Sequence, residues 1–144
     1  MIPFRFPLEN VLEWRRTQLE LEEDKFRQET AALAELDRLR AETEAAGVKA
    51  ELQVRHWRPV TGRDLGALDE FRRSVESNRK ELTALRAQRL KSLAAQQSAL
   101  MESRRRCRLL ERLKERRFEE WRLAAARELE ELASDSYLAR WNRR

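Results

Sequence analysis

The chain has 144 residues, of which 41% are hydrophobic, 40% charged and 7% aromatic, with only three glycines and three prolines. Its 31 Lys and Arg residues exceed its 26 Asp and Glu residues by five, too small an excess for a polybasic tail. One cysteine excludes an intrachain disulfide, and no apolar run approaches the roughly 18 to 20 residues that a membrane span needs.

Helix-breaking residues divide the chain into two long segments. Pro7 suits the first turn of a helix, where the missing N–H of proline costs nothing. Gly47 need not end that helix, whereas Pro59 should. We therefore predict a helix over about 8–57, a reversal over about 58–64 and a second helix over about 65–141, in a single coiled-coil domain of residues 1–144.

Apolar residues recur along both segments at the spacing of a coiled-coil seam. In the first segment they are Leu8, Leu12, Leu19, Phe26, Leu33 and Leu36. In the second they are Leu68, Phe71, Val75, Leu82 and Leu85, then Leu93, Leu100, Cys107 and Leu110. The polar Asn78 occupies the seam position between Val75 and Leu82. The irregular step from Leu85 to Leu93 suggests a stutter. Regular spacing argues against disorder, and the predicted fold is all-α, a long antiparallel two-stranded coiled-coil hairpin.

The two predicted helices are unequal, about 70 Å and 110 Å long at 1.5 Å per residue. We therefore expect a C-terminal helical overhang from about Leu113 to Trp141. It carries an apolar stripe: Phe118, Trp121, Ala125, Leu129, Leu132, Tyr137 and Trp141. Such a stripe is typical of a partner-binding surface. Self-association, or back-packing of the N-terminal Phe4 and Phe6, would also cover it.

The residues offer little for catalysis, and we expect no enzyme, cofactor or metal site. His56 and Cys107 are the single histidine and the single cysteine, and the predicted layout keeps them apart. There is no glycine-rich phosphate loop and no cluster of metal ligands. The basic run 104–108 fits a solvated or acidic-partner-facing patch better than a nucleic-acid site, because acids flank it and no aromatic residues interleave it.

Three stretches carry a resemblance to a known family. The opening FRFPLENVLEWR at 4–15 is similar to the F-x-F-x-L-E-x-V-L-x-x-R start of FliJ, the coiled-coil stalk protein of the bacterial flagellar type III export apparatus. Leu68-x-x-Phe71-x-x-x-Val75-Glu76 resembles an aromatic-x-x-Phe-x-x-x-Leu-Glu pattern of that family, with Leu and Val substituted. The stretch LLERLKER at 109–116, followed by EEW at 119–121, is similar to its C-terminal region.

The resemblance implies a non-catalytic stalk whose paired ends enter the pore of the hexameric export ATPase, FliI. It also implies a link to the export gate protein FlhA, handling of export chaperones, and a cytoplasmic location at the inner membrane through the apparatus. The residues facing the ATPase would be Phe4, Phe6, Leu8, Leu12, Leu110, Phe118 and Trp121. Those facing the gate would be Leu68, Phe71, Val75 and Asn78, although Phe71 and Val75 also fit plain seam positions. The alternative is a general coiled-coil scaffold or an injectisome stalk.

Overall fold

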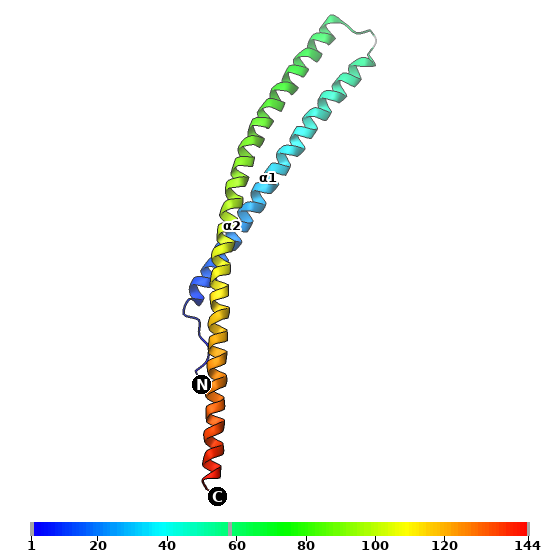
Figure 1. The fold of residues 1–144 in the computed structure, drawn as a ribbon. Helices are drawn as coiled ribbons and strands as arrows, with labels where there is room; N and C mark the ends of the chain where they lie inside the picture. Colours follow the sequence, from blue (N-terminus) through cyan, green and yellow to red (C-terminus); the bar gives the residue numbers. More distant parts are fainter. Residues whose placement is uncertain (1, 58, 144) are drawn as a thin grey trace. The chain divides into compact units, whose positions relative to one another are not determined.

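A computed structural model describes residues 2–57 and 59–143. It confirms the all-α hairpin: α1 (Glu9–Arg55, 47 residues) and α2 (Gly62–Trp141, 80 residues) pack against each other, and the described residues form no strand (Figure 1). Gly47 lies inside α1 and does not end it. The chain divides into two compact units, one of Glu22–Leu100 and one of Met1–Leu21 with Met101–Arg144.

The reversal between the helices is shorter than expected and is closed at both ends by hydrogen bonds. α1 ends before residue 57, and the amide of Trp57 donates to the carbonyl of Val54 at 3.1 Å. α2 begins at Gly62 rather than near 65 because Thr61 caps it. The Asp64 amide donates to Thr61 Oγ1 at 3.1 Å, and the Thr61 amide donates to Asp64 Oδ2 at 3.0 Å. This reciprocal pair satisfies two backbone donors that a helix start leaves open.

Within the unit Glu22–Leu100, each helix turns one stripe of half-buried residues toward the other. On α1 the stripe steps by three and four residues without a break: Phe26, Glu29, Leu33, Leu36, Arg40, Thr43, Gly47, Ala50 and Val54. On α2 it comprises Leu68, Val75, Leu82, Arg86, Leu93, Gln96 and Leu100. The stripe on α1 is a regular heptad seam, as the apolar spacing predicts.

The stripe on α2 departs from the predicted seam at Phe71, Asn78 and Leu85, which are all exposed. After Leu82 the next half-buried residue is Arg86, four positions on, whereas Leu85 is 41% exposed. The buried and half-buried positions of α2 recur every seven residues from Leu68 to Leu82 and again from Arg86 to Leu100, but Leu82 and Arg86 are only four apart. The stutter therefore lies between Leu82 and Arg86, and it places Leu93 and Leu100 on the seam. Leu85 is therefore not a seam residue.

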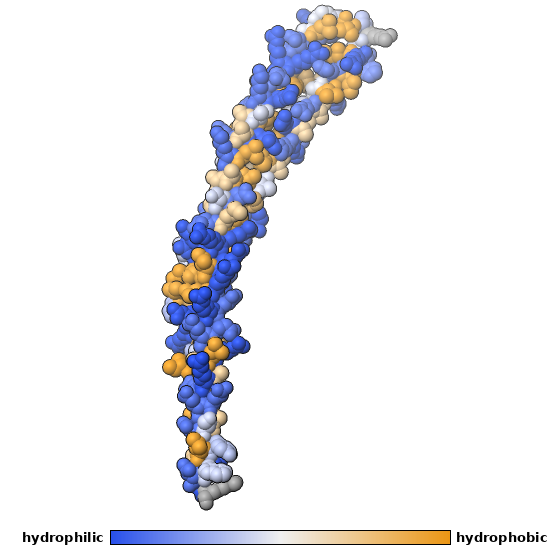
Figure 2. All heavy atoms as spheres, viewed as in Figure 1, coloured by the Kyte–Doolittle hydropathy of each residue, from blue (hydrophilic) through white to orange (hydrophobic). Residues whose placement is uncertain are grey.

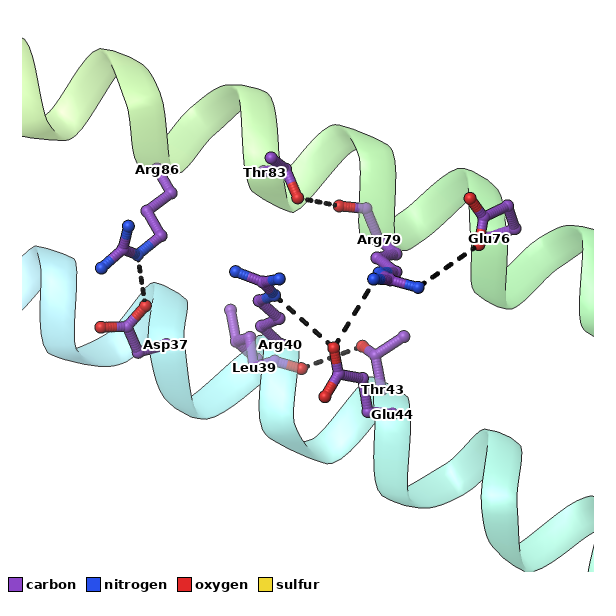
Figure 3. A network of polar contacts seen from close by, with 9 residues as sticks. All are labelled: Asp37, Leu39, Arg40, Thr43, Glu44, Glu76, Arg79, Thr83 and Arg86. Atoms are coloured by element: carbon purple, nitrogen blue, oxygen red, sulfur yellow. Dashed lines mark hydrogen bonds and ion pairs between the residues drawn. The ribbon is translucent and has the colours of Figure 1, made fainter.

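Polar cross-links between the helices repeat at seven-residue intervals. Three arginines of α2 meet three acids of α1, in the pairs Arg72–Glu51 (2.7 Å), Arg79–Glu44 (4.0 Å) and Arg86–Asp37 (2.7 Å). Figure 3 shows two of these pairs, with Arg40 and Glu76 joining the central one. We call the three pairs of Arg72, Arg79 and Arg86 with Glu51, Glu44 and Asp37 the acid–arginine ladder. It favours the antiparallel register because each arginine of α2 lies opposite an acid of α1.

The unit of Met1–Leu21 and Met101–Arg144 holds the best-packed apolar residues. Phe6, Leu12 and Cys107 are buried together, with Phe4, Leu19, Leu110 and Leu113 packed against them. The predicted overhang from Leu113 is therefore too long. The residues before α1 continue along α2 beyond the start of α1 and cover it as far as Trp121, and Ala125 is the last buried residue of α2. Among the described residues, every one after Ala125 is exposed.

Apolar residues on the surface are dispersed. Figure 2 shows hydrophilic residues over most of the visible face, with apolar residues in separate patches. Candidate binding sites must therefore be identified from the few places where exposed apolar residues are adjacent.

Candidate partner-binding surfaces

The N-terminal segment is attached to α2 by three aromatic rings. Phe4 lies edge-on to Phe118 with ring centroids 5.3 Å apart, and 5.9 Å from Trp121. Phe118 and Trp121 stack at 5.7 Å. The Trp121 indole N–H donates to the backbone carbonyl of Ile2 at 2.9 Å. We call Phe4, Phe118 and Trp121 the aromatic clamp, since it holds residues before α1 against a turn of α2 more than 110 positions later.

The aromatic clamp adjoins the buried cluster around Leu12, which is fully buried. Six of the seven residues that the resemblance assigns to ATPase binding thus belong to one contiguous apolar region: Phe4, Phe6, Leu12, Leu110, Phe118 and Trp121. The seventh, Leu8, is exposed and lines a depression of about 660 Å³ together with Trp121 and Leu113.

Burial divides these seven residues by the role they can play. Phe6 and Leu12 are buried, so they hold the chain ends together and have little surface to offer a partner. Leu8 and Phe118 are exposed, while Phe4 and Trp121 are half-buried. A partner would therefore meet the rims of the aromatic clamp and Leu8 rather than the cluster beneath them.

Two ion pairs frame this apolar region. Lys114 Nζ lies 2.7 Å from Glu9 Oε2, at the first residue of α1. Arg16 Nε donates to Glu111 Oε1 at 3.4 Å. The same carboxylate accepts from the Cys107 thiol at 3.6 Å. Burial, aided by the Glu111 charge, raises the pKa of the Cys107 thiol, so it stays protonated and acts as an apolar filler.

Sequence reasoning missed Leu113 and the Ile2 carbonyl as parts of this region. The spacing of Leu110 and Leu113 by three residues on a helix could have indicated the first. No pattern in the sequence could have indicated the Ile2 carbonyl, because every residue has a backbone carbonyl.

The second candidate surface lies within the unit Glu22–Leu100, where Phe71 and Val75 line a depression with Gly47 and Val48. A Cβ added at Gly47 would lie 3.4 Å from Val75 Cγ1, an ordinary van der Waals contact, so there is room for an alanine between the helices here. Phe71 is 39% exposed and Val48 is 60% exposed. Charged side chains surround these apolar residues: Glu44, Glu51, Arg72, Glu76 and Arg79.

The four residues that the resemblance assigns to the export gate do not share one environment. Leu68 is buried, Val75 is half-buried, and Phe71 and Asn78 are exposed. Val75 therefore serves the seam, as its spacing predicts, while Phe71 is exposed to solvent. Phe71 with Val48 is the part of this surface that a partner can reach.

No group of three or more His, Cys, Asp or Glu among the described residues could hold a metal ion. His56 is exposed in the reversal. Within the same part of the chain, neither helix is long and apolar enough to cross a membrane.

Comparison with family models, with curated proteins and with solved structures finds no match to this chain. The likeness to FliJ therefore rests on the three sequence motifs.

Proposed function

We propose that the chain is a non-catalytic stalk protein of a flagellar type III export apparatus, which binds the hexameric export ATPase FliI and links it to the export gate protein FlhA. One observation carries the proposal. The motif at 4–15 and the motif at 109–121 lie at opposite ends of the sequence, yet their apolar residues form one region. A stalk whose two chain ends enter a pore together needs those ends to pack against each other in this way.

The surface chemistry supports this role. A stalk inside a six-fold pore meets six equivalent surfaces and must bind each of them weakly. The region offers exposed apolar rims at Leu8 and Phe118, framed by ion pairs at Lys114 and Arg16. Small apolar contacts within a charged border suit reversible binding better than a deep pocket does.

The decisive experiment uses the purified chain with the export ATPase encoded in the same genome. We expect the chain to shift the ATPase from small species to hexamers in sedimentation velocity, and to raise its ATP hydrolysis. Unchanged oligomerisation and unchanged hydrolysis would reject the stalk role and favour the alternative, a general coiled-coil scaffold.

Variants at Trp121 separate the ring from its hydrogen bond. Trp121→Ala removes both and should weaken ATPase binding about tenfold or more, because aromatic anchors dominate binding energies. Trp121→Phe keeps a ring but cannot donate to Ile2, so binding should fall less. Leu123→Ala is the matched control, an exposed residue two positions away. A large loss of helicity in Trp121→Ala would instead mean that Trp121 is chiefly structural.

The gate contact is tested at Phe71, the exposed ring of the second surface. Phe71→Ala should weaken binding to the cytoplasmic part of the gate protein while ATPase stimulation stays unchanged. Leu90→Ala is its control, because Leu90 has a similar exposure on the same helix. Equal losses in both variants would argue against a gate site at Phe71.

A further inference from the structure

The chain reverses between α1 and α2 in a basic segment, residues 52–65, which we call the hairpin tip (Figure 1). It contains three arginines, one histidine and a single acid, Asp64. The carboxylate of Asp64 already accepts the Thr61 amide at 3.0 Å. Arg55 and Arg63, by contrast, are exposed and form no ion pair with another described residue. The hairpin tip therefore presents positive charge that the chain itself does not neutralise.

The hairpin tip also exposes large apolar side chains from each of its three parts. Leu52 belongs to α1, and Leu65 belongs to the first turn of α2. Trp57 and Val60 lie between the two helices. Trp57 is 47% exposed and Leu65 is 55% exposed. Figure 2 shows apolar side chains on the surface at this end of the hairpin. Tryptophan is typical of membrane–water interfaces, because its ring is apolar while its N–H bonds to water.

The distribution of these residues favours a lipid surface over a partner helix. A helix that packs on another helix follows a stripe along it. The exposed apolar residues of the hairpin tip are instead spread over a helix end, a turn and the start of the next helix. Such a turn is convex, so a protein partner would need a matching cavity, whereas a bilayer interface adapts to its shape. Anionic headgroups would pair with the arginines, whose long stems can lie along apolar surface.

We propose that the hairpin tip binds the surface of an anionic lipid bilayer, with Trp57 and Val60 in the interfacial layer and Arg55 and Arg63 at the phosphate groups. The contact is peripheral, since neither helix in the described part of the chain is long and apolar enough to cross a membrane. Apolar area and charge both contribute to binding of this kind. The contact does not depend on the proposed stalk function, because the hairpin tip shares no residue with the surfaces that the resemblance assigns to the ATPase and the gate.

Co-sedimentation of the full chain with lipid vesicles tests the proposal. We expect the chain to bind vesicles made of equal parts of phosphatidylcholine and phosphatidylglycerol. Binding to vesicles of phosphatidylcholine alone should be at least about tenfold weaker, because each arginine near an anionic surface contributes about fivefold. Added salt should weaken binding to the anionic vesicles, since it screens the surface charge.

A charge reversal tests whether the arginines of the hairpin tip make the contact. Arg55→Glu with Arg63→Glu should weaken binding to the anionic vesicles at least about tenfold. The control is Arg105→Glu with Arg108→Glu, which changes the net charge equally at two exposed arginines of the other unit. The control should bind the anionic vesicles at least about fivefold more tightly than the reversed hairpin tip does.

A second variant tests the apolar part of the contact. Trp57→Ala should weaken binding to the anionic vesicles about fivefold, because it removes apolar area that the interface would cover. Trp14→Ala is the matched control, since Trp14 is exposed to a similar extent and lies in the other unit. Circular dichroism checks that every variant remains helical.

A fluorescent probe shows which part of the chain meets the bilayer, and it leaves the arginines and Trp57 in place. In a Cys107→Ser background, an environment-sensitive fluorophore attached at Val60→Cys should shift its emission to shorter wavelength when anionic vesicles are added. The same fluorophore at Leu90→Cys should not shift. Leu90 and Val60 have nearly equal exposure, and both belong to the unit Glu22–Leu100.

Three results would overturn the proposal. A wild-type chain that does not bind the anionic vesicles would leave an acidic protein as the partner of the hairpin tip. Equal losses in the reversed hairpin tip and in its control would mean that overall charge drives the binding. Equal shifts at Val60→Cys and Leu90→Cys would mean that the helices lie along the bilayer. Should a reversed variant lose helicity, the two labelled chains still decide the question.

Discussion

Gly47 lowers the stability of the helix that contains it. It lies inside α1, where glycine is about 1 kcal/mol less favourable than alanine. A Cβ there would be 3.4 Å from Val75 Cγ1, an ordinary van der Waals distance. Gly47→Ala should therefore stabilise the hairpin by about 0.5–1 kcal/mol. Urea denaturation followed by circular dichroism measures this, and a destabilised variant would mean that the two helices need a closer approach than the structure has.

Single residues also show where sequence reasoning was limited. The apolar spacing located Leu12, Leu68 and Leu100 on the seam, and all three are buried. It misplaced Leu85, because residue type alone cannot tell which of two adjacent positions a stutter brings inward. Arg86 takes the seam position by extending its long side chain to Asp37.

At the scale of one helix, the start of α2 depends on an ionised Asp64. The Thr61 backbone amide, and then its hydroxyl, hold the pKa of Asp64 below its ordinary value. A lowered pKa means that the cap contributes fully above the ordinary aspartate pKa and is lost as pH falls through the lowered value. We expect the first turn of α2 to fray on acidification, with faster amide exchange at residues 62–66 than in the middle of the helix.

Thr61→Ala tests the same cap at neutral pH. It removes the acceptor of the Asp64 amide and should destabilise the hairpin by about 1 kcal/mol. Thr83→Ala is the control, because Thr83 bonds only to the carbonyl of Arg79 four residues earlier and lies inside the helix. Equal effects of the two changes would mean that capping is not what sets the start of α2.

The acid–arginine ladder sets the pairing of the two helices. Reversing Arg72, Arg79 and Arg86 to Glu should destabilise the hairpin by about 2 kcal/mol at low salt, since exposed pairs contribute only about 0.2–1 kcal/mol each. Reversing Glu51, Glu44 and Asp37 to Lys in the same chain should restore most of that loss. Thermal denaturation at two salt concentrations measures both steps, and failure of the second reversal to rescue the first would show that the ladder is incidental.

At the scale of the whole molecule, the sequence predicted what periodicity and helix breakers encode: two helices, their antiparallel return and unequal lengths. It did not predict where the overhang begins. Periodicity gives the face of a helix that packs but not the segment that covers it, and residues 2–7 have no periodicity of their own. Only the contacts of Phe4 and Ile2 with Trp121 place them on α2.

That covering segment leads to a prediction about truncation. In a chain ending at Arg127, all the described residues that are lost (128–143) are exposed, so its unfolding free energy should change by no more than about 0.5 kcal/mol. A chain ending at Arg117 also loses Phe118, Trp121 and Ala125, and should be destabilised by about 2 kcal/mol or more. Helicity should decrease with chain length in both truncations, since the tail is itself helical. If the two truncations destabilise the chain equally, the residues after Ala125 pack against part of the molecule, and the stable region of α2 does not end where the N-terminal segment stops covering it.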